Sequence, residues 1–68
     1  MHKDLIEQAE DLIRRLELKA TGANIHEYKS TISLLYVYCK FIEQGLEIEK
    51  HKEKLLEKME EARRIVFK

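Results

Sequence analysis

Residues 41–48, with the sequence FIEQGLEI, decide the fold of this chain, because they place Gly45 between two helix-forming segments. On both sides of Gly45, apolar residues recur at alternating intervals of four and three residues. That spacing is typical of the side along which one helix packs against another. The series is Leu34, Tyr38, Phe41, Gly45, Ile48, Lys52, Leu55, Met59, Ala62 and Val66. We predict that all of these residues except Lys52 form a helix–helix interface, and that none of them is catalytic.

Two folds are compatible with Gly45. In the first, Gly45 lies inside one long helix from about residue 25 to 67, and the chain is an all-α helical hairpin with a long second helix. The unbroken spacing favours this fold, and so does the lack of a preferred N-cap residue after Ser33. An interior glycine costs roughly 1 kcal/mol relative to alanine, which helix packing can offset.

In the second fold, Gly45 ends a helix in the left-handed conformation, and Leu46 folds back onto Phe41. The chain is then a monomeric three-helix bundle broken at Gly45. Its helices are expected near residues 4–20, 25–44 and 47–67. We predict the fold with the long helix and keep the three-helix bundle as the alternative.

A second apolar series on another side of the same segment predicts self-association of the hairpin. Its members are Tyr28, Ile32, Leu35, Cys39, Ile42 and Leu46. A helix with two apolar sides must be covered from two directions, and the first helix covers only one of them. A parallel pair of copies would bring Lys58 toward the partner's Arg63, whereas an antiparallel pair sets Glu49 opposite that arginine. We therefore predict an antiparallel dimeric four-helix bundle of two hairpins.

The first helix and the loop after it also have clear signals. The apolar line of this helix consists of Leu5, Ala9, Leu12 and Leu16, widened by Ile6 and Ile13. Gly22 is predicted to end the helix in the left-handed conformation. Asn24 is predicted to cap the next helix, with Glu27 as the reciprocal partner in a capping box.

The composition bounds the size and the class of the protein. The 68 residues form a single helical domain, and a chain of this length usually needs a partner or very regular packing for its stability. Its only cysteine, Cys39, excludes an internal disulfide. The 13 basic and 13 acidic residues give no net charge, so the chain lacks the broad positive field that drives nucleic-acid binding.

No residue pattern predicts catalysis, a cofactor or a metal site. Neither His26 nor His51 has a glutamate three residues before it, which is the spacing found in di-metal helical bundles. Cys39 lies among apolar residues, where burial keeps a thiol protonated and unreactive. The most apolar run, residues 31–42, is shorter than the ~20 residues that a membrane span needs. We therefore expect a cytoplasmic protein that is not an enzyme and has no membrane partner.

The sequence thus predicts a protein–protein interaction module that acts through helix packing, by self-association, scaffolding or regulation of a partner. We expect a homo-oligomer, with a dimer favoured, and a protein partner is possible. An engineered helical bundle is an origin that fits the same pattern. The alternative function is that of a small nucleic-acid-associated regulator, although nucleic acid is the less expected partner. Its candidate residues are Arg14, Arg15, Arg63 and Arg64.

Overall fold

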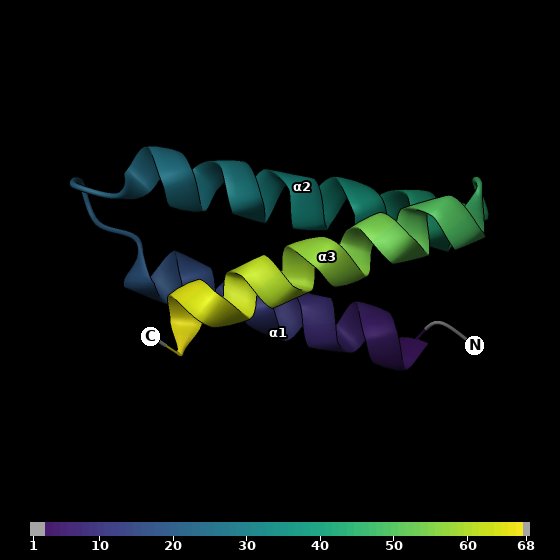
Figure 1. Ribbon diagram of the computed structural model, residues 1–68, viewed down its shortest axis with the longest axis horizontal. Coiled ribbons are helices and arrows are strands. Elements are labelled where there is room, and N and C mark those ends of the chain that lie inside the picture. Colours follow the sequence, from purple (N-terminus) through teal and green to yellow (C-terminus); the bar gives the residue numbers. More distant parts are fainter. Residues whose placement is uncertain (1–2, 68) are drawn as a thin grey trace.

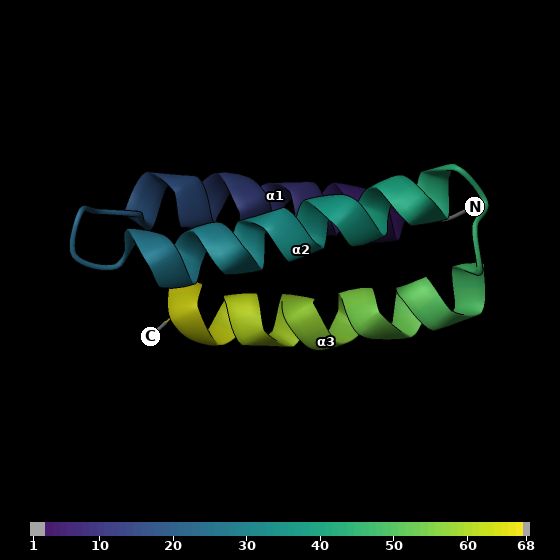
Figure 2. The same cartoon turned by 90° about the horizontal axis from the view of Figure 1, so that it is seen from above.

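The computed structural model describes residues 3–67, and within them the chain forms three helices that pack side by side (Figures 1 and 2). They are α1 (Lys3–Lys19), α2 (Ile25–Glu43) and α3 (Ile48–Val66). Successive helices run in opposite directions, so α1 and α3 point the same way (Figure 1). The all-α prediction is confirmed, and the helix bounds agree with the three-helix alternative. None of the helices in the described part has the length and apolar character needed to cross a membrane.

The prediction of a long second helix is wrong, because the chain reverses direction at Gly45. The φ angle of Gly45 is +74°, in the left-handed region that glycine adopts at little cost. Its N–H donates to the carbonyl of Ile42 at 3.0 Å, and the N–H of Leu46 donates to the carbonyl of Phe41 at 3.0 Å. This pair of bonds is the Schellman motif, which satisfies the last carbonyls of a helix and directs the chain away from its axis.

Helix α3 begins without a side-chain N-cap, and His51 stabilises the turn instead. Glu47, the residue before α3, also has a positive φ, of 39°, and makes no side-chain cap bond. The ring of His51 lies 2.7 Å, through Nδ1, from the carbonyl oxygen of Leu46. Because a carbonyl only accepts, Nδ1 carries the proton and donates. The same ring lies 4.6 Å from that of Phe41, between centroids, so His51 also packs on α2.

The reversal at Gly45 covers both apolar sides of α2. Helix α1 lies along the side that carries Cys39, since Ile13 and Cys39 line the same hollow. Helix α3 lies along the other side, where His51 contacts the rings of Tyr38 and Phe41. Each of two helices that pack on one another has apolar residues at intervals of four and three. This spacing therefore occurs on both sides of Gly45 although α2 and α3 are separate helices.

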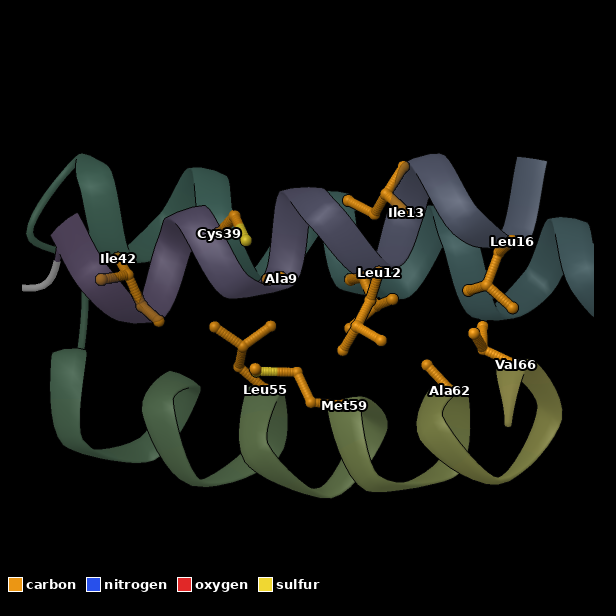
Figure 3. Close-up of a cluster of buried hydrophobic side chains, with 11 residues drawn as sticks. Ala9, Leu12, Ile13, Leu16, Cys39, Ile42, Leu55, Met59, Ala62 and Val66 are labelled. Carbon is orange, nitrogen blue, oxygen red and sulfur yellow. The ribbon is translucent and has the colours of Figure 1, made fainter. Parts of the chain in front are cut away.

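The core is built from all three helices (Figure 3). Its buried apolar side chains are Ala9, Leu12, Ile13, Leu16, Leu35, Cys39, Ile42, Leu55, Met59, Ala62 and Val66. In Figure 3, Leu55 and Met59 point from α3 toward α1 and α2. The four large side chains with the least exposure come from all three helices, so removing any one helix would open the core. They are Leu16, Leu35, Leu55 and Met59.

The loop between α1 and α2 differs from the prediction in its details. Gly22 does not adopt a positive φ. Asn24 occupies the predicted N-cap position, but its side chain makes no cap bond. Its Oδ1 instead accepts a hydrogen bond from the N–H of Thr21 at 2.7 Å. Asparagine side chains often bind nearby backbone in this way, so the predicted capping box with Glu27 does not form.

Candidate interaction surfaces

The predicted interface residues lie mainly inside one copy of the chain. Four of them are fully or nearly fully buried in the core, namely Leu55, Met59, Ala62 and Val66. Another four are half-buried, namely Leu34, Tyr38, Phe41 and Ile48. Gly45 is exposed in the turn between α2 and α3. In this fold the α3 part of the series holds α3 on the other two helices, so it does not offer a surface to a second copy.

A groove, which we call the α1–α2 groove, runs along α1 and α2. It consists of three adjoining hollows with volumes of about 560, 420 and 210 Å³, which share Glu10 and are lined only by residues of these two helices. Ile13 points away from α3, whereas Leu12 and Leu16 point toward it (Figure 3). The apolar floor of the groove consists of Ile6, Ile13, Cys39 and Ile42.

The two rims of the α1–α2 groove differ in charge. The rim on α1 is mainly acidic and consists of Glu7, Glu10, Arg14 and Glu17. The rim on α2 carries Tyr36, which is 60% exposed, together with Lys40 and Glu43. Lys29 precedes Tyr36 by seven residues and lies on the same side of α2. The groove therefore has a largely buried apolar floor, with the exposed ring of Tyr36 beside it, between an acidic rim and a rim with lysines.

The α1–α2 groove was not predicted from the sequence. The available signal was the widening of the apolar line of the first helix by Ile6 and Ile13, directly beside Glu10 and Glu17. A groove, however, arises only when two helices are placed side by side. The periodicity of either helix alone does not give the alignment that sets Glu10 beside Lys40.

Cys39 is the one titratable group in the floor of the groove. Burial raises the pKa of its thiol from an ordinary 9.0 to about 11, and the negative charges of Glu10 and Glu43 add to this effect. The thiolate is the nucleophilic form of cysteine, so these surroundings suppress reactivity. The prediction that burial keeps Cys39 protonated agrees with this environment.

Alkylation of Cys39 tests that environment. At pH 8 we expect iodoacetamide to react with the folded protein roughly a hundredfold more slowly than with the protein in urea, because a pKa of about 11 leaves so little thiolate. Since the folded pKa exceeds the unfolded one, Cys39 favours the folded state fully below pH 9.0 and loses this contribution as the pH rises toward about 11. Equal alkylation rates in the two states would show that Cys39 is accessible.

A second surface lies where α1 and α3 end, at the same end of the bundle (Figure 1). The Lys19 ammonium donates to the carbonyl of Val66 at 2.6 Å, which joins the ends of the two helices. The Arg15 guanidinium lies 5.7 Å from the centre of the Phe67 ring. This end, which we call the basic end, includes three of the four arginines of the nucleic-acid hypothesis. Its basic residues are Arg15, Lys19, Arg63 and Arg64, whereas Arg14 lines the α1–α2 groove.

The described residues show no other site with recognisable chemistry. Between residues 3 and 67, no three His, Cys, Asp or Glu side chains come close enough together to hold a metal ion. Comparison with protein-family models, with curated protein sequences and with solved structures finds no match. The two surfaces therefore have to be interpreted from their own geometry and charge.

Proposed function

We propose that this protein is a protein–protein interaction module that self-associates through the α1–α2 groove. The observation that carries the proposal is this groove, in which the exposed ring of Tyr36 and a floor of Ile6, Ile13, Cys39 and Ile42 lie between an acidic rim and a rim with lysines. Helical bundles cover such a surface with a further helix or pair of helices. A second copy of the chain supplies a pair whose rims have the complementary charges.

A two-fold axis parallel to the helices suits these charges. It places α1 of one copy over α2 of its partner and keeps every residue at its height along the bundle. Glu10 and Lys40 line the same hollow and so lie at about the same height. Across this axis, Glu10 of each copy therefore meets Lys40 of the other. This assembly differs from the antiparallel four-helix bundle expected from the sequence, because the helices in contact are two α1–α2 pairs and α3 of each copy lies on the outside.

The opposite arrangement, with α1 placed on α1, is disfavoured by the same rim. It would bring the glutamates of the two copies together, and like charges at an interface cost binding free energy. The residues concerned are Glu7, Glu10 and Glu17. In the favoured arrangement the main exception is Glu43, which lies on the α2 rim among the acidic side chains.

Solution mass and charge reversal together test the proposal. Light scattering behind size exclusion is expected to give twice the monomer mass of 8.2 kDa at high protein concentration and to fall toward that mass on dilution. Glu10→Lys and Lys40→Glu alone should each weaken the dimer about tenfold or more, as expected for a close charge pair at an interface. The double variant should regain most of the wild-type affinity.

Glu57→Lys is a matched control, because Glu57 is an exposed residue of α3 and lies outside the groove. It changes the net charge by the same amount as Glu10→Lys and should leave the dimer unchanged. A mass of 8.2 kDa at every concentration would contradict self-association. A dimer that the single reversals weaken, and the double variant does not restore, would contradict the proposed alignment of Glu10 with Lys40.

A further inference from the structure

The two most exposed large apolar side chains of the described residues both lie at the basic end. Leu18, in the last turn of α1, is 87% exposed, and Phe67, directly after α3, is 67% exposed. Arg15 lies against the Phe67 ring. Leu18 follows Arg15 by three residues and therefore lies one turn further along the same side of α1. Leu18 and Phe67 thus lie at the same end of the bundle, and we call these two side chains the apolar tip.

Basic side chains of both helices lie near the apolar tip. Asp11 pairs with Arg15 at 2.9 Å and Glu61 pairs with Lys58 at 3.0 Å, so Arg15 shares its charge with Asp11, and Lys19, Arg63 and Arg64 are the basic residues in the last turns of α1 and α3. Glu17 and Glu60 are the remaining acidic residues beside the arginine pairs. The negative ends of the α1 and α3 dipoles account for cations at this position. They do not account for two large apolar side chains exposed among those cations.

We propose that the basic end binds the surface of a membrane that contains anionic lipids. Leu18 and Phe67 would enter the boundary between headgroups and acyl chains, while the basic residues contact the anionic headgroups. Protruding apolar side chains with basic residues nearby suit a soft, flat surface. The expectation of no membrane partner rested on the lack of a spanning segment, and a peripheral contact needs none.

Two other partners fit the apolar tip less well. A helix of another protein would need a concave site, and neither Leu18 nor Phe67 lines the α1–α2 groove. A single-stranded nucleic acid would use the arginines and stack a base on Phe67. It would leave Leu18, the most exposed of the large apolar side chains, without a partner. Of these three partners, only a lipid surface would contact both the basic residues and the two exposed apolar side chains.

Co-sedimentation with lipid vesicles tests the proposal. Vesicles of phosphatidylcholine and phosphatidylserine should bind the wild-type protein, and vesicles of phosphatidylcholine alone should bind it at least tenfold more weakly. Raising the salt concentration should weaken binding, because the attraction of the basic residues is screened. The double variant Leu18→Ser/Phe67→Ser should bind the anionic vesicles at least tenfold more weakly than the wild type. Circular dichroism verifies that this variant is folded.

Leu56→Ser is the matched control, since Leu56 is also an exposed leucine but lies near the middle of α3. It should bind the anionic vesicles like the wild type. Absence of wild-type binding, or equal binding by the Leu18→Ser/Phe67→Ser variant, would overturn the proposal. It would also be overturned if a single-stranded oligonucleotide bound more tightly than the vesicles and kept its affinity in that variant. Vesicle binding is measured at a protein concentration at which light scattering gives the monomer mass of 8.2 kDa, so that the result is independent of self-association.

Discussion

Leu55→Ala is expected to lower the free energy of unfolding by about 3–5 kcal/mol, the largest effect of any single substitution proposed for this chain. Leu55 is 0% exposed and points from α3 into the space between α1 and α2 (Figure 3). Its truncation removes apolar contacts and leaves a cavity that three short helices cannot close fully. A domain of this size has a total stability of roughly 3–10 kcal/mol. Urea unfolding followed by circular dichroism should therefore show a strongly destabilised protein.

Leu56→Ala is the control, because it changes the same side chain at the next position along α3. Leu56 is 45% exposed, so its loss should cost less than about 1 kcal/mol. If Leu55→Ala leaves no folded protein to titrate, Met59→Leu provides a measurable core change, expected to cost less than about 1.5 kcal/mol. Equal losses for Leu55→Ala and Leu56→Ala would contradict the orientation of α3 in this fold.

The apolar periodicity of the sequence was sufficient for the helices but not for their arrangement. The bounds of α1 follow from a single apolar line that ends before Gly22. For α2 and α3, the spacing of four and three shows that each helix packs lengthwise on another. It does not show whether that other helix belongs to the same chain. The apolar residues of α3, such as Leu55 and Val66, recur at the same intervals in a coiled coil and in a three-helix bundle. The two folds differ only in which helices pack against α2.

The local errors have a common physical cause, which is competition between neighbouring polar groups. Asn24 is a preferred cap residue, but its oxygen binds the N–H of Thr21 in the preceding loop. The start of α3 has no preferred cap, yet His51 reaches back to the carbonyl of Leu46. Residue preferences rank single positions, whereas these bonds depend on how the loop closes. The position of His51 one turn into α3, opposite the ring of Phe41, is a tertiary consequence of the reversal at Gly45.

Gly45→Ala is expected to lower the free energy of unfolding by about 1–2 kcal/mol, which is the usual cost of the left-handed conformation for a residue with a Cβ atom. The φ of Gly45 is +74°, and an added Cβ would meet no atom within 4 Å. The cost is therefore strain of the backbone alone, without a steric clash. The sign of the effect distinguishes the two folds. Within a continuous helix, the same substitution would stabilise the protein by roughly 1 kcal/mol.

Gly22→Ala separates this strain from the general effect of replacing a glycine. An added Cβ at Gly22 would also meet no atom within 4 Å, but the φ of Gly22 is not positive. Alanine there restricts the unfolded chain without straining the folded one, so it should be neutral or stabilise the protein by up to about 1 kcal/mol. The two variants should thus shift the urea midpoint in opposite directions, or only Gly45→Ala should shift it. Stabilisation by Gly45→Ala would mean that α2 and α3 are one helix, and the α1–α2 groove would then need to be reconsidered as part of a longer interface.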